Sequence, residues 1–256
     1  MTRSASVRAA AGVVVAGVLV AGVSGCGASA GDDDHPDHRA FALHGRTLTV
    51  DSDNSSLEVV AAPGNKAGTV QVTRWFQGSV MVGSDPKVSW SFKDDRLVLR
   101  VRCSGFIADC SARHRIEVPR GIAVKVENGD GSVRAHGFAD PLTIRTSDGS
   151  VRVTDSSGAL NLRSDDGSVR ADVSSRRVRA GSSDGSVRLE LDAVPDLVDA
   201  GSDDGSVTVA LPRAAYRVKA GSDDGSVSVS VPRDDTSPHA VSAHSSDGKV
   251  TVRTAN

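Results

Sequence analysis

The sequence predicts an all-β protein and, within that class, a β-solenoid, which is a stack of short repeated coils. The main observation is a tetrapeptide, D-G-S-V, that occurs six times and is followed by an altered copy, D-G-K-V. Apolar residues alternate with polar ones around each copy, which is the period of a β-strand. A phrase repeated so often indicates architecture, because an active site needs its residues only once. The copies begin at Asp130, Asp148, Asp166, Asp184, Asp204, Asp224 and Asp247.

The spacing around each Asp-Gly predicts a corner. In six copies an apolar or small residue before it and a valine after it lie seven positions apart, as Ile144 and Val151 do. On one continuous strand these two residues would face opposite sides, so the chain must turn for both to face one core. We expect each Asp to hydrogen-bond backbone N–H groups and each Gly to adopt positive φ. The corner residues are Asp148, Gly149, Asp166, Gly167, Asp184, Gly185, Asp204, Gly205, Asp224 and Gly225.

Two architectures satisfy this pattern. Asp-Gly between alternating strands is also a strong signal for a hairpin, so an antiparallel β-meander or barrel is the alternative. Near-identical repeats that differ mainly in one connection are typical of stacked units, and they favour the solenoid. The low aromatic content of 3% also suits a thin core of Val, Ala and Leu.

Residues 1–25 have the features of an export signal. Arg3 and Arg8 precede an apolar run from Ala9 to Val23, which is short for a membrane span. The run ends in V-S-G-C, which resembles the lipobox of bacterial lipoproteins, in which the cysteine is diacylated. Two acyl chains on Cys26 would give stable membrane attachment. An ordinary cleaved signal with an incidental Cys26 is the alternative.

The rest of the chain divides into a tether and one domain. Residues 26–42 lack apolar periodicity and are expected to form a flexible tether after the lipidated cysteine. Its Asp and His residues could bind a divalent metal weakly, although a solvated spacer explains them. Residues 43–256 are expected to form a single β-repeat domain, irregular over 43–128 and regular over 129–253.

Charge and cysteine content limit the partners. The formal net charge of −2 argues against bulk electrostatic binding of nucleic acid. Once Cys26 is lipidated, Cys103 and Cys110 remain as a pair, and an oxidising compartment favours a disulfide between them. A two-thiolate metal site with His114 is the alternative. We expect no cofactor.

The D-G-S-V ladder, the less regular strands ahead of it and the lipobox together resemble a bacterial family labelled putative adhesins, also called toastrack domains. The resemblance covers roughly Leu43 to Arg253. It implies stacked β-repeats on envelope or secreted proteins, with relatives near envelope-stress systems. It supplies no catalytic residues.

One repeated outward position is a candidate binding site. Equivalent residues on neighbouring coils stand about 4.8 Å apart, so four stacked guanidinium groups could bind phosphate or carboxylate in bidentate fashion. The alternative is a solvated face neutralised by the neighbouring column of aspartates. Those aspartates suggest calcium, but their turn role explains them and no metal site is predicted. The candidate residues are Arg134, Arg152, Arg170 and Arg188.

No group of residues indicates catalysis. The seven histidines are scattered, and the glycines precede strands where a phosphate-binding loop would precede a helix. The sequence therefore predicts a non-enzymatic lipoprotein, exported and facing outward from the cell membrane, that binds cell-wall polymer or an envelope protein. A sensory or regulatory partner of an envelope-stress system is the alternative.

Overall fold

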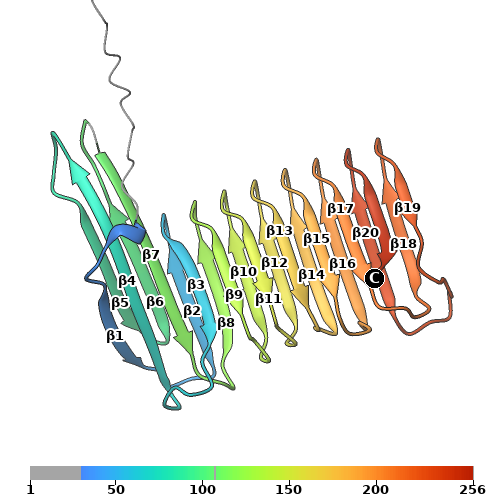
Figure 1. Ribbon diagram of the computed structural model, residues 1–256, viewed down its shortest axis with the longest axis horizontal. Coiled ribbons are helices and arrows are strands. Elements are labelled where there is room, and N and C mark those ends of the chain that lie inside the picture. Colours follow the sequence, from blue (N-terminus) through green and yellow to red (C-terminus); the bar gives the residue numbers. More distant parts are fainter. Residues whose placement is uncertain (1–29, 107, 256) are drawn as a thin grey trace, which may run out of the picture.

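Two long β-sheets pack face to face as a flattened solenoid in the computed structural model, which describes residues 30–106 and 108–255 (Figure 1). The predicted signal peptide and Cys26 lie outside these residues. A short 3₁₀ helix, η1 (Ala30–Asp32), precedes the strands. In the described part of the chain, no helix is long and apolar enough to span a membrane.

Neighbouring strands in each sheet mostly come from successive repeats. Sheet A contains, in spatial order, β1 (Asp37–Ala42), β4 (Thr69–Val80), β7 (Ala108–Val118), β3 (Ser56–Ala61), β9 (Val133–His136), β11 (Val151–Thr154), β13 (Val169–Val173), β15 (Val187–Leu191), β17 (Val207–Leu211), β21 (Val250–Thr254) and β19 (Val227–Val229). Sheet B contains β18 (Arg217–Ser222), β20 (Ala240–Ser245), β16 (Leu197–Ser202), β14 (Arg177–Ser182), β12 (Leu160–Ser164), β10 (Leu142–Thr146), β8 (Ala123–Asn128), β2 (Thr47–Ser52), β6 (Arg96–Arg102) and β5 (Lys87–Lys93).

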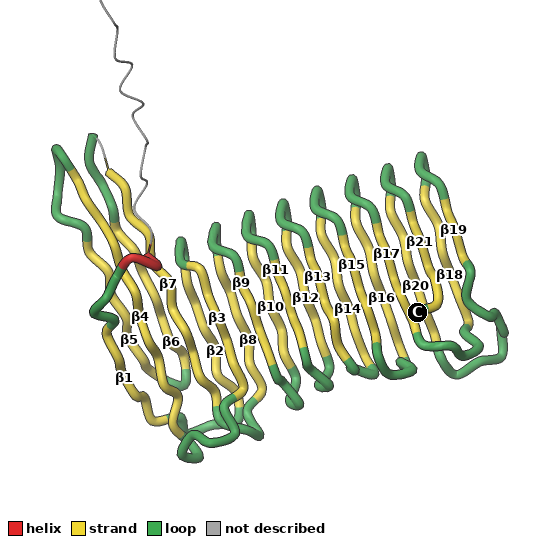
Figure 2. The backbone as a smooth tube through the Cα atoms, viewed as in Figure 1, coloured by secondary structure: helices red, strands yellow, loops and turns green. Residues whose placement is uncertain are grey.

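The repeats pair in parallel, residue for residue. Val151 is the partner of Val169, and Val169 is the partner of Val187. The chain passes from sheet B to sheet A at each Asp-Gly corner and returns through the variable connection on the opposite side (Figure 2). Among the described strands, antiparallel pairing is confined to β1, β4 and β7 and to β5 with β6. The solenoid prediction is confirmed, and the antiparallel meander or barrel is wrong for the repeats.

The core lies between the sheets and follows the spacing of seven. Ile144 and Val151 are both fully buried although they stand on opposite sheets, and Leu162 and Val169 repeat the arrangement one coil further on. Because the register is parallel, each such residue packs on its equivalent in the next coil. One continuous apolar cluster therefore extends along the whole stack.

The two ends of the stack are closed differently. At the N-terminal end, Phe41 stacks on Phe92 with ring centres 5.1 Å apart and meets Trp90 edge-on at 6.4 Å. At the other end, the last coil in the sequence, β20–β21, lies between β16–β17 and β18–β19. The coil that ends the stack in space is therefore not the last in the sequence (Figure 1).

Glycine is required at these corners because the backbone of the neighbouring coil leaves no room for a side chain. None of Gly149, Gly167 and Gly185 has a positive φ, so that expectation was wrong. A Cβ added at Gly167 would lie closer than 3.0 Å to the carbonyl oxygen of Gly149 on the neighbouring coil, and Gly185 meets Gly167 in the same way. The physical reason is that parallel stacking presses one corner backbone directly against the next.

A buried serine, and not the aspartate, forms the hydrogen bonds to the backbone groups of the corner. The Ser182 hydroxyl accepts a hydrogen bond from the N–H of Gly185 (3.0 Å) and donates to the carbonyl of Gly167 on the neighbouring coil (2.9 Å). The expectation that the aspartate carboxylates bond the corner was wrong, because these residues are exposed and their side chains make no hydrogen bond within the described residues. The same serine bonds recur at Ser164, Ser202, Ser222 and Ser245.

Replacing Gly167 with Ala tests the crowding. The added methyl group must displace the backbone of the neighbouring coil, so we expect the free energy of unfolding to fall by about 1 to 3 kcal/mol, the usual cost of overpacking. Urea unfolding followed by circular dichroism measures the change. The control is Ser157→Ala in the exposed variable connection, where we expect less than about 0.5 kcal/mol. Equal stabilities of the two variants would contradict the role given to the corner.

Candidate functional site

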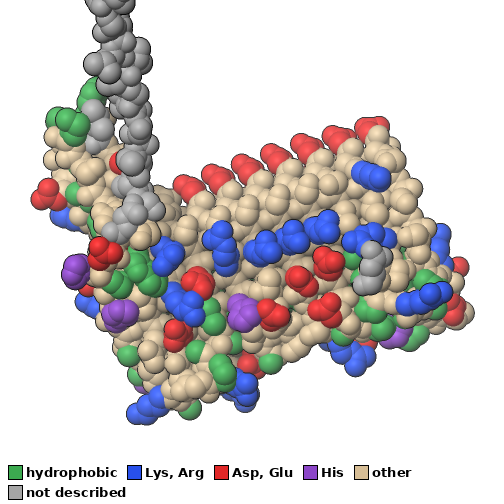
Figure 3. All heavy atoms as spheres, viewed as in Figure 1, with side chains coloured by type: hydrophobic (Ala, Val, Ile, Leu, Met, Phe, Trp, Pro, Cys, Tyr) green, Lys and Arg blue, Asp and Glu red, His purple; other side chains and the backbone are tan. Residues whose placement is uncertain are grey.

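Four arginines form a straight row on the outer face of sheet A (Figure 3). The parallel register pairs Arg134 with Arg152, Arg152 with Arg170, and Arg170 with Arg188. All four side chains are exposed, because the positions on either side of each arginine point into the core. With strands about 4.8 Å apart, the four Cα atoms span about 14 Å. We call these four residues the arginine row.

Most of the arginine row lacks a counter-charge. Arg188 lies 3.8 Å from Glu190, but Arg134, Arg152 and Arg170 form no ion pair with any residue that the structure describes. The corner aspartates, which would neutralise the row in the alternative interpretation, make no ion pair with it. Like charges directly opposite each other on neighbouring strands repel, so the row favours the approach of an anion.

The arginine row ends abruptly on both sides. On the N-terminal side, Glu58 occupies the equivalent position and forms an ion pair with Arg115 of β7. On the C-terminal side, Thr208 is the partner of Arg188, and Thr251 is the partner of Thr208. At this repeat position, positive charge without a carboxylate partner is therefore confined to the coils that carry the row.

A hollow of about 430 Å³ opens at the N-terminal end of the row. Arg134, Arg152, His136, Thr154 and Glu58 line it. The Nδ1 atom of His136 lies 3.1 Å from the Thr154 hydroxyl. Guanidinium, imidazole and hydroxyl groups together can donate hydrogen bonds to the oxygen atoms of a phosphate or carboxylate.

The corner aspartates form an exposed acidic edge along the solenoid (Figure 3). One such carboxylate from each coil stands about 4.8 Å from the next. In residues 30–106 and 108–255 there is no group of three or more His, Cys, Asp or Glu side chains that could hold a metal ion. The absence of a metal site remains a prediction for the whole chain.

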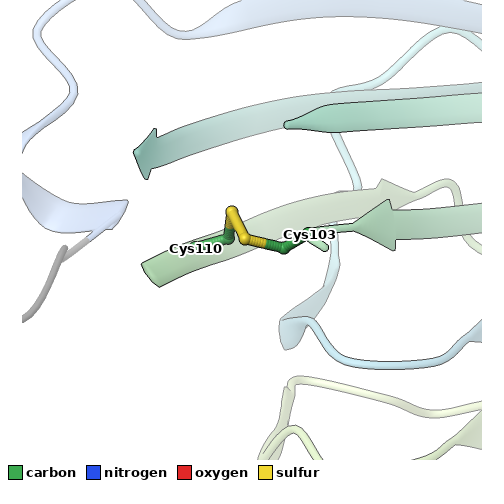
Figure 4. The surroundings of a disulfide bond; sticks show 2 residues. All are labelled: Cys103 and Cys110. Carbon is green, nitrogen blue, oxygen red and sulfur yellow. A yellow bond between two sulfur atoms is a disulfide. The ribbon is translucent and has the colours of Figure 1, made fainter. Parts of the chain in front are cut away.

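Cys103 and Cys110 form the expected disulfide (Figure 4). Their Cα atoms are 6.1 Å apart, and the bond joins the end of β6 to the start of β7. Both sulfur atoms are thus engaged, so the alternative of a two-thiolate metal site is wrong. On β4, Gly78 lies so close that a Cβ there would be 3.0 Å from the Sγ atom of Cys110.

A partly buried polar cluster at the N-terminal end was not predicted from the sequence. The guanidinium of Arg74 lies 4.3 Å from the ring centre of Trp90 and forms an ion pair with Asp37. His114 is fully buried beside Trp90, and neither ring nitrogen has a hydrogen-bond partner. Burial, and then the charge of Arg74, lower the pKa of His114 to about 4. The available signal was that His114 falls on the inward side of an alternating strand.

Family comparison agrees with this architecture. The sequence matches the family described as Toastrack DUF4097 over residues 32–256. The chain belongs to the toastrack family. This membership accounts for the stacked parallel coils, and it assigns no ligand to the toastrack chain.

Solved structures of similar shape come from several bacteria. A protein named as a putative adhesin from Bacteroides fragilis is 16% identical with a TM-score of 0.50, over 87% of the toastrack chain and 98% of the other. One from Parabacteroides distasonis, named in the same way, is 13% identical with a TM-score of 0.47, over 88% and 98%. At these identities only the fold is shared. No curated protein matches the toastrack chain.

His114 makes the stability of the domain depend on pH. Because its pKa falls from 6.5 in the unfolded chain to about 4 in the folded one, only the unfolded state gains a proton between these values. The free energy of unfolding should therefore decrease as the pH falls from 6.5 to about 4, by about 1.4 kcal/mol per pH unit at most.

The variant His114→Leu isolates this effect, because it retains every other titrating group. Urea unfolding of both proteins at several pH values should show a wild-type curve that is steeper in this range than the curve of the variant. Parallel curves would mean that His114 takes up its proton equally in both states.

Proposed function

We propose that this protein is an exported lipoprotein, anchored through Cys26 on the outer face of the cell membrane, whose solenoid binds anionic cell-wall polymer through the arginine row. The domain acts by binding and performs no catalysis. The observation that carries this proposal is the register of Arg134, Arg152, Arg170 and Arg188, three of which have no carboxylate partner among the described residues.

The geometry favours a polymer over a single small anion. The row presents planar guanidinium forks at intervals of about 4.8 Å, so one chain of phosphates or carboxylates can contact several coils at once. Several weak contacts along one chain give a combined affinity greater than that of any single contact. The adhesin names of the similar structures support a surface role of this kind.

The sequence supports the anchor independently of the row. The lipobox-like V-S-G-C ending at Cys26 follows an apolar run of 15 residues, and the disulfide between Cys103 and Cys110 suits an oxidising compartment. Two acyl chains would retain the domain at the surface, next to the wall polymer that the row is proposed to bind.

Changing Cys26 to Ser tests the anchor. We expect the wild-type precursor to incorporate radioactive palmitate and to fractionate with membranes, and the variant to incorporate none. Intact mass of the purified wild-type protein gives the same answer directly. An unmodified Cys26 in wild-type protein recovered from the culture medium would refute the anchor.

Replacing all four arginines of the row with Thr tests the binding face, since Thr208 and Thr251 already occupy the equivalent position in later coils. Retention on immobilised polyphosphate and on polygalacturonate should fall at least about tenfold at low salt, and the difference should shrink at 0.15 M, where the screening length is about 8 Å. The two matrices separate phosphate from carboxylate chemistry.

The matched control replaces four cationic residues on the outer face of sheet B with neutral ones and leaves the row intact. Its net charge equals that of the row variant, so a general charge effect would weaken both proteins equally and would overturn the proposal. Binding by the control should stay close to wild type. The control residues are Arg145, Arg163, Arg179 and Lys219.

A further inference from the structure

The large apolar side chains that are exposed gather mainly at one tip. Within the described residues, Met81 is 76% exposed, Val82 67% and Phe106 87%, and the fourth such residue, Val227, lies at the other end of the stack. Met81 and Val82 follow β4, whereas Phe106 belongs to the loop between β6 and β7. The N–H of Phe106 donates to the carbonyl of Val82 (2.7 Å), which brings the two loops together. We call Met81, Val82 and Phe106 the apolar tip.

The backbone around the apolar tip is tightly braced. The disulfide between Cys103 and Cys110 closes the loop that carries Phe106. Gly83 and Gly105 pair as an isolated antiparallel bridge, so close together that a Cβ on either would collide with the other loop. This bracing holds the apolar side chains in solvent, where an exposed cluster normally marks a contact surface.

The apolar tip projects beyond the solenoid. β4 has 12 residues and β7 has 11, whereas the strands of the regular coils have three to six. Figure 1 shows the ends of these long strands standing clear of η1 and of the nearest corner. An approaching flat surface on this side can therefore meet the tip before it meets the neighbouring coils.

The N-terminal segment enters beside the same strands. η1 packs against β4 and β7, and the Asp33 carboxylate accepts a hydrogen bond from the N–H of Phe76 (2.9 Å). This hydrogen bond is the main reason that the pKa of Asp33 is lowered. Met81 lies five residues beyond Phe76 on an extended strand, or about 17 Å.

The chain between Cys26 and Asp33 is long enough to cover the distance of about 17 Å from Phe76 to Met81. Asp33 lies seven positions after Cys26. The four steps from Cys26 to Ala30 span at most about 14 Å, and the three steps through η1 add about 6 Å, which gives at most about 20 Å. A lipid on Cys26 can therefore lie level with the apolar tip while Asp33 stays on β4. The lipid on Cys26 and the apolar tip can therefore reach the same flat membrane surface.

We propose that the apolar tip inserts into the outer leaflet of the phospholipid membrane in which Cys26 is anchored. This proposal rests on the proposed lipidation of Cys26. The tip then forms a second point of attachment, which fixes how the solenoid stands on the membrane. A lipidated cysteine on a tether cannot fix that orientation alone.

The size of the tip argues for lipid as its occupant. Three side chains are far fewer than the 20 to 30 residues that each partner contributes to a typical stable protein interface. A weak apolar contact suffices at a bilayer, because the lipidated cysteine already holds the tip at high effective concentration.

Full-length lipidated protein reconstituted in phosphatidylcholine and phosphatidylglycerol vesicles tests the proposal. The variant Phe106→Trp places a fluorophore at the tip, and Val227→Trp places one at the opposite end as the matched control. With brominated lipids we expect the added emission of Phe106→Trp to fall about twofold, and that of Val227→Trp to stay unchanged. Wild-type protein supplies the background from Trp75 and Trp90.

Each outcome decides a different point. Unquenched Phe106→Trp in protein whose intact mass shows a diacylated Cys26 would overturn this proposal and leave the proposed function standing. An unmodified Cys26 would refute the anchor and this proposal together. Equal quenching of both variants would mean that the solenoid lies flat on the lipid, and an emission change that requires added envelope proteins would identify a protein occupant. Either result would overturn insertion of the tip.

Discussion

Corner-on-corner stacking is the constraint on which the structure depends. In five corners a serine hydroxyl accepts a hydrogen bond from the glycine N–H of its own coil and donates one to the glycine carbonyl of the neighbouring coil, as Ser182 does with Gly185 and Gly167. The glycines have no side chain because the next backbone occupies that space. A slip of one residue would break both hydrogen bonds and turn the core valines outward, so the corner fixes the register of every coil.

The arginine row is a consequence of that register. Parallel pairing places Arg152 directly between Arg134 and Arg170, although each residue is only one exposed position in its own repeat. Repulsion within the row opposes folding, but buried valine rows such as Val151 to Val187 and the corner hydrogen bonds offset it. A stable scaffold can therefore carry a charged face that is largely without local compensation, which costs stability.

Specialisation of the protein lies at the ends of the stack. At the N-terminal end, long antiparallel strands, the disulfide between Cys103 and Cys110, and the buried cluster around Trp90 replace the plain repeat. The same end receives the N-terminal segment and carries the apolar tip. The opposite end is closed by a rearranged coil order, in which β20–β21 precedes β18–β19 in space. The regular coils give the stack its length, and the irregular ends close it.

The sequence alone determined the all-β class, the stacked coils, the inward pairing of Ile144 with Val151, and the pairing of Cys103 with Cys110. These features depend on local periodicity and on near-identity between repeats, which are written directly in the chain. The arginine row was also predictable, because equal positions of equal repeats must align once the register is parallel.

Only the tertiary structure decided the features that depend on contacts between distant residues. The crowding at Gly167 comes from the backbone of Gly149, 18 positions earlier in the chain. Positive φ was the wrong explanation for the corner glycines, because the sequence of a single turn does not show which backbone packs against it. The absence of a hydrogen-bond partner for His114, the hydrogen bond between Phe106 and Val82, and the insertion of β20–β21 likewise arise from how the chain folds back on itself. The local sequence pattern predicts whether a residue faces the core or the solvent. It does not predict which distant residue packs against it.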